Sequence, residues 1–420
     1  MIEPDDRRFL TSLFDAAVAA ADPKKALAGV LPDKPKGRTI VVGAGKGAAQ
    51  MAAAFEDLWG EPVEGVVVTR YGYGGPTRYL PVIEASHPVP DAAGLDAAHA
   101  LTDAVAGLTE DDLVVALICG GGSALLPAPP EGLTLEDEQS LNRALLASGA
   151  PISAMNAIRK HVSTIKGGRL AMAAHPAPVV SLIVSDVPGD DPAQVASGPT
   201  VPDALRLSEA RDLIDTFRIT LPERIAAYLD NAPEAPHPDD PVFAGNTVRV
   251  VASAAISLEA AADAARAQGI TPVILSDAIE GEARDVGMVH AAIAREVCLR
   301  NRPFEAPVVI LSGGETTVTV QGDAGRGGRN SEFLLSFASH TEGLPLTALA
   351  ADTDGIDGSE DNAGAFANGT SLARLRQAGR DPGAMLAGHD AWTAFDTIGD
   401  LFVPGPTGTN VNDFRAILIR

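Results

Sequence analysis

Apolar residues along this chain form two patterns, continuous runs of strand length and the spacing of an amphipathic helix. The two patterns alternate throughout the sequence. Four continuous apolar runs in the first half have the length of strands, and they lie at residues 39–42, 65–69, 113–119 and 179–185. Such runs are typical of strands that are buried on both faces of a sheet. Helical spacing of apolar residues lies between them. This alternation predicts an α/β fold with a parallel sheet covered by helices on both faces.

The second half resumes the pattern after a proline-rich break. Residues 231–241 contain four prolines, which is typical of a linker. We therefore predict two domains, a Rossmann-like domain at 1–235 and a second α/β domain at 236–420. Further strands are expected at 247–251, 271–275, 308–311, 316–320 and 346–350. Because parallel α/β sheets bind ligands at the carboxyl ends of their strands, we expect the active site in the cleft between the domains.

Composition narrows the class of partner. The 420 residues are 46% hydrophobic but only 4% aromatic, so the core consists mainly of aliphatic side chains and alanine. The formal net charge is −23, which disfavours nucleic acid and anionic membranes as partners. A site for a small anionic substrate must then be built locally from lysine, arginine and backbone N–H groups. A homodimer is compatible with these data, but the sequence leaves the oligomeric state open.

Cysteine usage and the first residues bear on the compartment. Two cysteines, Cys119 and Cys298, cannot form a disulfide framework. The chain begins with an acidic segment rather than a signal-peptide pattern, and it has no run of about 18 apolar residues. We expect a cytoplasmic protein.

Two glycine-rich turns follow predicted strands. The first contains Gly43, Gly45 and Lys46, and the second contains Gly121, Gly122 and Ser123. Glycine lets backbone N–H groups approach an anion, and a lysine adds a full charge. The first turn is not a Walker A loop, because glycine follows the lysine where serine or threonine is required. It matches the looser dinucleotide pattern, yet no acid stands about 20 residues later. The alternative is a plain strand-to-helix turn, with Ser123 as a helix cap.

A basic segment interrupts this acidic chain. Between residues 156 and 169 there are several cations and no acid. We expect Asn156, Arg159, Lys166 and Arg169 to bind a carboxylate or phosphates, by hydrogen bonds and charge. The alternative is a basic helix face that pairs with acids elsewhere in the chain.

Aspartates after strands are candidates for a metal site or a proton acceptor. Asp186 and Asp190 follow the run at 179–185, and Asp354 lies in an acidic loop after the run at 346–350. Carboxylates in such positions hold Mg²⁺ or take a proton from a substrate hydroxyl. An ordinary Asx-turn is the competing interpretation. His87 is a further candidate, but a lone histidine is more often structural, so it stays outside the predicted site.

The remaining polar segments lie in the second half. Glu315 follows a predicted strand, and glycines surround Arg326 and Arg329, which leaves the arginines able to approach a polyphosphate. A loop near the C-terminus contains Thr409 and Asn410. Each segment alone is also compatible with a flexible loop.

Taken together, the motifs resemble the glycerate 2-kinase family, whose C-terminal part is called the MOFRL domain. They span nearly the whole chain in order, and they are GAGKGA (43–48), SHPVPD (86–91), CGGGSALLPAP (119–129), MNAIRKHVSTIKGGRLA (155–171), VSDVPGDDPAQVASGPTVPD (184–203), SGGETTVTV (312–320), GRGGRNSEF (325–333), ADTDGIDGSEDNAGA (351–365) and GPTGTNVND (405–413). The resemblance implies a C-terminal α/β domain with a mixed sheet.

The resemblance also implies an activity, in which ATP and Mg²⁺ serve to phosphorylate D-glycerate at its 2-hydroxyl. The family's essential lysine and arginine fall on Lys46 and Arg329, with Arg326 as the rival arginine. We expect Asp186 or Asp190 to act as proton acceptor or metal ligand, with Asp354 as an alternative metal ligand. The remaining expected contacts to ATP and glycerate come from Gly43, Gly45, Gly121, Gly122, Ser123, Asn156, Arg159, Lys166, Arg169, Glu315, Asn330, Thr409 and Asn410. Many family members are labelled hydroxypyruvate reductase, so an NAD(P)H-dependent reductase is the alternative function.

Overall fold

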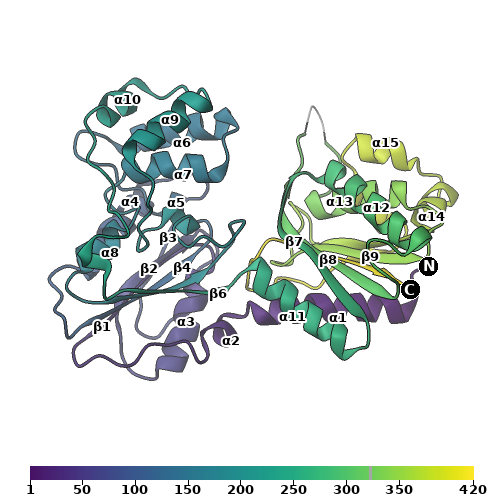
Figure 1. The fold of residues 1–420 in the computed structure, drawn as a ribbon, viewed down its shortest axis with the longest axis horizontal. Helices are drawn as coiled ribbons and strands as arrows, with labels where there is room; N and C mark the ends of the chain where they lie inside the picture. Colours follow the sequence, from purple (N-terminus) through teal and green to yellow (C-terminus); the bar gives the residue numbers. More distant parts are fainter. Residues whose placement is uncertain (321–323) are drawn as a thin grey trace. The chain divides into compact units, whose positions relative to one another are not determined.

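The computed structural model describes residues 1–320 and 324–420, which form two compact units. The inserted unit is the continuous stretch Pro23–Val251, and the terminal unit combines Met1–Asp22 with Ala252–Arg420. Figure 1 shows the helices and strands of both.

The inserted unit is built on one six-stranded sheet with the order β3-β2-β1-β4-β5-β6. The neighbouring pairs from β3 to β5 are parallel, which confirms the predicted parallel sheet. This is the strand order of doubly wound dinucleotide-binding folds. Its strands are β1 (Thr39–Ala44), β2 (Glu64–Arg70), β3 (Val82–Ala85), β4 (Leu113–Cys119), β5 (Val179–Val184) and β6 (Thr247–Ala252).

Helices cover this sheet on both faces, with α3 on one and α4, α5 and α8 on the other (Figure 1). A separate helical cluster packs around Leu141, Ile158 and Ile225. The helices are α2 (Pro23–Leu27), α3 (Ala48–Trp59), α4 (Ala92–Ala104), α5 (Gly122–Leu125), α6 (Leu135–Ser148), α7 (Ile152–His161), α8 (Arg169–Ala174), η1 (Val195–Ser197), α9 (Leu207–Thr216), α10 (Glu223–Leu229) and η2 (Pro241–Phe243).

The terminal unit has a second six-stranded sheet, of order β11-β10-β9-β12-β8-β7. Only β7 and β8 are parallel, and the other pairs are antiparallel, so the expected mixed sheet is confirmed. The strands are β7 (Thr271–Glu282), β8 (Val308–Thr317), β9 (Leu346–Asp352), β10 (Gly364–Asn368), β11 (Leu401–Phe402) and β12 (Asp413–Ile419). The half-exposed strand expected at 316–320 is only the last part of β8, which ends at Thr317.

Two helical layers enclose the second sheet. The N-terminal helix α1 places Phe9, Leu13 and Phe14 against α11 and one face of the sheet. Helices α12 and α13 pack on the opposite face (Figure 1). The helices are α1 (Pro4–Ala20), α11 (Ala254–Ala267), α12 (Ala283–Arg300), α13 (Arg329–His340), α14 (Ser371–Gln377), α15 (Pro382–Ala387) and α16 (Ala391–Thr397).

These units differ from the expected ranges 1–235 and 236–420 in two respects. The apolar stripe of α1 is buried in the terminal unit, although the helix precedes the inserted unit in sequence. The proline-rich stretch belongs inside the inserted unit, because the chain continues beyond it to add β6 to the first sheet. Asn246 anchors this return, since its Oδ1 accepts a hydrogen bond from the Val179 N–H over 2.9 Å. The prolines of residues 231–241 correctly indicated an interruption of the strand and helix pattern, but they did not show that this stretch lies within the inserted unit.

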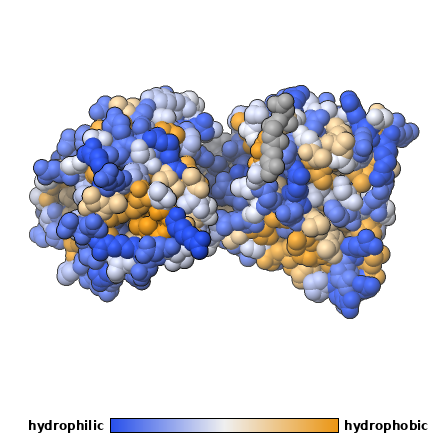
Figure 2. Space-filling model, turned by 90° about the horizontal axis from the view of Figure 1, so that it is seen from above, coloured by the Kyte–Doolittle hydropathy of each residue, from blue (hydrophilic) through white to orange (hydrophobic). Residues whose placement is uncertain are grey.

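Hydrophilic side chains cover much of the face seen in Figure 2, in keeping with the high net charge. Within the described residues, no helix combines the length and the apolar character needed to cross a bilayer.

Candidate active site

The order of the first sheet reverses between β1 and β4, and ligands of such sheets bind outside the carboxyl ends of the strands at this point. Both strands end in the glycine-rich turns. The turn after β1 crosses the end of β4, where the Lys46 N–H donates to the Gly120 carbonyl over 2.9 Å. Gly45 makes this crossing possible, because its φ is +131° and an added Cβ would lie 2.4 Å from the Cys119 carbonyl oxygen. The two turns therefore form one joined edge.

The turn after β4 is surrounded by polar side chains. A Cβ added at Gly121, whose φ is +79°, would lie 3.1 Å from Cγ of Lys46 and 3.3 Å from Nε2 of His87. A Cβ added at Gly120 would overlap the Asp186 carboxylate. Because Gly120 and Gly121 have no side chain, the side chains of Lys46, His87 and Asp186 can lie directly against the backbone of this turn.

Lys46 is the cation of this edge. Its side chain is partly exposed, and no carboxylate pairs with it among the residues that the structure describes. Arg70, at the end of β2, likewise has no ion pair within that part of the chain, and its guanidinium lies 4.5 Å from the ring centre of Tyr73. Two cations without acidic partners, beside a glycine turn, form a place where an anion gains favourable charge contacts.

His87 joins these cations from the loop after β3. Burial, followed by the nearby charges of Lys46 and Arg70, lowers the pKa of His87 to about 4. Its imidazole is therefore neutral near pH 7 and keeps a lone pair. The predicted site omitted both His87 and Arg70. Their positions at the carboxyl ends of β3 and β2 were the available signal, because neighbouring parallel strands bring such residues to one edge.

The other glycines and Ser123 have local structural partners. Gly43 packs between β2 and β4, where an added Cβ would lie 2.8 Å from Val67. Gly122 lies against Ala196. The Ser123 hydroxyl bonds to that of Ser197 over 2.8 Å, and does not cap α5.

Asn156 and Arg159 extend this network. The Ser197 hydroxyl donates to Oδ1 of Asn156, which also accepts from Arg159. Nε of Arg159 donates to Asn142 over 2.9 Å. Burial lowers the pKa of Arg159 to about 10, so it stays charged near neutral pH. The network fixes the loop of η1 beneath the second glycine turn.

The basic segment is largely neutralised inside the inserted unit, and Lys166, which we expected to bind substrate, is one of the neutralised residues. Its ammonium is 1% exposed and pairs with Glu138 over 2.6 Å, and Lys160 pairs with Asp203. Arg169 donates from one nitrogen to the carbonyls of residues 160 and 166. These contacts match the interpretation as a basic face paired with acids elsewhere, because burying a lysine requires a partner.

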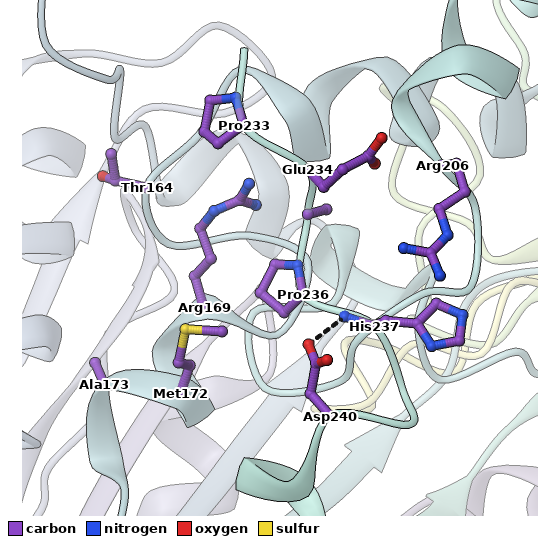
Figure 3. Close-up of a pocket in the computed structure, with 11 residues that line it drawn as sticks. Thr164, Arg169, Met172, Ala173, Arg206, Pro233, Glu234, Pro236, His237 and Asp240 are labelled. Carbon is purple, nitrogen blue, oxygen red and sulfur yellow. Dashed lines mark hydrogen bonds between the residues drawn. The ribbon is translucent and has the colours of Figure 1, made fainter.

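Arg169 also lines a pocket of about 560 Å³ (Figure 3). The proline-rich stretch forms one wall, where the His237 N–H donates to Asp240 over 2.8 Å. Arg206 supplies the second cation of the lining, and Glu234 and Asp240 supply two acids. The lining charges balance, and neither glycine turn contributes to the pocket.

The predicted aspartates occupy different settings. Asp186 faces the glycine turn, whereas Asp190 lies in the turn after β5, where its N–H donates to the Val187 carbonyl. Asp354 closes an Asx-turn by accepting from the Ile356 N–H over 2.8 Å. The described part of the chain contains no group of three or more residues arranged to hold a metal ion.

Arg329 is the centre of a charged cluster in the terminal unit. It donates to Asp413 over 2.6 Å, to Asp352 over 2.8 Å and to Glu315 over 3.0 Å. Burial acts to lower the pKa of Arg329, but the three carboxylates outweigh it and raise the pKa well above its ordinary value. Asn330 joins the cluster by donating to Asp413.

Arg326 has a different environment. It is exposed, pairs with Glu360 and lies over the Trp392 ring, with 3.4 Å from its guanidinium carbon to the ring centre. The loop near the C-terminus is held by one long-range bond, from the Thr409 hydroxyl to the Ala21 carbonyl over 2.9 Å, and by a local bond from the Asn412 N–H to Asn410. Of the two arginines, only Arg329 lies among several buried acids.

Comparisons with known proteins agree with this arrangement. Residues 9–230 match the family described as Domain of unknown function (DUF4147), and residues 308–413 match the MOFRL family. A protein of Agrobacterium vitis named "Putative hydroxypyruvate reductase" is 54% identical over 416 residues, which are 98% of this chain and 94% of that one. A "Glycerate 2-kinase" of Pyrococcus horikoshii is 39% identical, over 100% of this chain and 98% of its own. The crystal structure of a glycerate kinase from Thermotoga maritima superposes with a TM-score of 0.89 at 35% identity, covering 99% of each chain.

Proposed function

The chain belongs to the glycerate 2-kinase family, and on this basis we propose that it is an ATP-dependent kinase of D-glycerate. The γ-phosphoryl group passes to the 2-hydroxyl, which gives 2-phosphoglycerate and ADP. The observation that carries this proposal within the structure is the unpaired Lys46 above Gly121, at the point where the order of the parallel sheet reverses. Relatives named glycerate kinase support the choice of acceptor.

Phosphoryl transfer requires positioning and neutralisation of charge more than covalent chemistry from the protein. Lys46 supplies a full charge that no carboxylate among the described residues has already neutralised. Arg70 supplies a second charge at the same edge. The polyphosphate of ATP therefore meets two cations beside a turn that carries no side chains.

Arg329 has a separate proposed role in the terminal unit. Its charge is permanent, and its side chain is 22% exposed, so one face of the guanidinium remains open to a ligand. Glu315 is the most exposed of its three partners, at 50%. Exchange of Glu315 for a phosphate oxygen would keep the guanidinium fully bonded.

The residues present are compatible with Mg²⁺ of the kind that kinases use. Mg²⁺ commonly takes one or two carboxylates and draws its remaining ligands from water and substrate phosphates. Asp186 beside Gly120 offers such a carboxylate, and Asp190 on the next turn offers a second. Bound there, Mg²⁺ would neutralise phosphate charge.

A reductase of hydroxypyruvate is the second candidate. It is favoured by the names of the Agrobacterium vitis relatives and by Arg70, because an arginine near this strand end accommodates the 2′-phosphate of NADP in related folds. The absence of an acid at the end of β2 disfavours NAD itself, since that acid normally binds the ribose.

One pair of assays separates the candidates. The protein is incubated with ATP, Mg²⁺ and D-glycerate, and ADP and the phosphoglycerate isomer are measured; a parallel sample receives NADPH and hydroxypyruvate. We expect 2-phosphoglycerate in the first sample and no NADPH consumption in the second. The reverse result would replace the kinase by the reductase. GTP and other hydroxy acids, tested in the same way, define donor and acceptor range.

The Lys46→Ala variant tests whether the charge of Lys46 contributes to phosphoryl transfer. Loss of one charge contact to the transition state should reduce kcat by about 10²–10³-fold. Lys36→Ala is the matched control, because Lys36 is 89% exposed and pairs only with Asp111. Turnover by Lys46→Ala equal to that of the control would remove Lys46 from the mechanism.

A further inference from the structure

Hydrogen bonds of neighbouring residues fix the loop that carries His87, although its imidazole ring makes no hydrogen bond itself within the described residues. The Ser86 N–H donates to Asp91 over 3.2 Å, and the hydroxyl of Tyr71 donates to the same carboxylate over 2.8 Å. On the other side, Gln139 donates to the Pro90 carbonyl over 2.7 Å. The loop that carries the imidazole is therefore fixed at both ends against the sheet edge.

The ring itself has no hydrogen-bond partner within the described residues. Two other histidines differ, since the buried His290 bonds to Ser312 and the partly buried His389 bonds to Glu332. Nε2 of His87 lies 3.3 Å from the position that a Cβ at Gly121 would fill. A positioned imidazole with free nitrogens, above a gap that only glycine leaves open, is available to a ligand.

We propose that His87 binds the attacking hydroxyl of the acceptor acid and takes its proton. This inference rests on the proposed function and adds the proton acceptor to it. The hydroxyl oxygen forms the new bond to the γ-phosphorus, and the bond from that phosphorus to the bridging oxygen of ADP breaks with its electron pair. The hydroxyl proton moves to Nε2 of His87. Atoms and charge balance without any further reactant.

The charges around the ring fit this role. In the free protein, burial and the cations Lys46 and Arg70 keep the imidazole neutral, so one ring nitrogen keeps a lone pair that can accept a proton. A bound polyphosphate neutralises these cations and raises the affinity of the ring for a proton. Two acids lie at the same edge, Asp186 beside Gly120 and Asp91 bonded to the Ser86 N–H. The ring thus becomes a better base when ATP is present.

His87→Asn tests the step by kinetics. Asparagine keeps a hydrogen-bonding group but cannot take the proton, so we expect kcat to fall by about 10²–10⁴-fold while KM for ATP changes little. The decline of wild-type kcat/KM at acid pH should be absent from the residual activity of the variant. His175→Asn is the matched control, because His175 is exposed and also precedes a proline.

Chemical mapping of the wild-type protein provides a test that does not depend on how a variant folds. Diethyl pyrocarbonate acylates neutral imidazole, and peptide mass spectrometry locates the product. At pH 5, His87 should still react at nearly its rate at pH 7, because its pKa is lowered to about 4. Inorganic tripolyphosphate should slow its reaction. A rate for His87 that falls steeply between pH 7 and pH 5, or no reaction of His87, would overturn the assignment.

The outcomes separate this inference from the proposed function. Wild-type activity with full activity in His87→Asn removes His87 as proton acceptor and leaves the kinase intact. Absence of glycerate phosphorylation in the wild type ends the proposed function and this step together. A loss of kcat that leaves the acid limb of the pH profile unchanged identifies a structural effect, and also contradicts the proposal.

Discussion

Arg329 donates from Nε to Oδ1 of Asp413 across 2.6 Å, at the junction of α13 and the central strand β12. Asp413 is fully buried and also accepts from Thr316 and Asn330. Burial acts to raise the pKa of Asp413, but the charges of Arg415 and Arg329 outweigh it, and the net pKa is lowered. One predicted catalytic residue is therefore also a structural cation of the terminal unit.

Arg329→Ala should consequently lose stability as well as activity. Removal of the guanidinium leaves the buried Asp352 without its cation, and breaking such a buried pair costs about 3–5 kcal/mol. Urea unfolding followed by near-UV circular dichroism measures the change. Arg326→Ala, which removes a partly exposed ion pair and the contact with the Trp392 ring, should lower the unfolding midpoint by much less. Equal midpoints for the two variants would contradict the buried network.

Gly121→Ala should cause a loss of turnover that is larger than its loss of stability from backbone strain can explain. The left-handed φ of +79° costs a non-glycine residue about 1–2 kcal/mol, and the new methyl group meets Lys46 and His87. Gly60→Ala is the control, because its φ is +75° and no atom lies within 4 Å of the added Cβ. Both variants should lose similar stability, but only Gly121→Ala should lose turnover. Steady-state kinetics on folded protein decides between them.

Lys166→Met should lower stability without changing the KM for glycerate. The substitution leaves the Glu138 carboxylate buried without its cation, which costs about 3–5 kcal/mol. Adding Glu138→Gln to Lys166→Met should recover part of the loss. An increase in KM, with unfolding unchanged, would restore Lys166 to the substrate-binding set.

His290 should make the terminal unit sensitive to acid. Burial is the main cause that lowers its pKa to about 4, against an ordinary value near 6.5. At pH values between these two pKa values, His290 is protonated in the unfolded chain but not in the folded chain. The stabilising contribution is complete above pH 6.5 and is lost as pH falls toward 4, by about 3 kcal/mol in all. Stability of His290→Gln, measured from pH 4 to 7, should depend less steeply on pH than that of the wild type.

Strands β1, β2, β4 and β5 of the first sheet were predictable because most of their residues are buried. Leu113–Cys119 matches its prediction residue for residue, and β1, β2 and β5 differ from theirs only at the ends. Strand β3, which is only partly buried, gave no clear apolar run. The strand expected at 247–251 was also found, as β6, although its first three residues are exposed, so burial is one signal among others.

Long-range pairing was not predictable in the same way. Lys166 and Glu138 are 28 residues apart, and Lys160 and Asp203 are 43 apart, so the basic segment alone could not show that acids neutralise it. Strand β12 was missed as well, although it lies between β8 and β9 in the second sheet. The glycine turns were recognised, whereas the meeting of His87 with Lys46 depends on the order of the strands.

The position of β12 also sets an order on biosynthesis. The second sheet takes its central strand from residues 413–419 and its first helix from residues 4–20, with the whole inserted unit between them in sequence. During translation, residues 23–251 are complete long before the ribosome makes residues 413–419. Until then the second sheet is incomplete, and its unpaired strands and the apolar face of α1 stay exposed. We therefore expect nascent chains that lack residues 413–419 to bind chaperones.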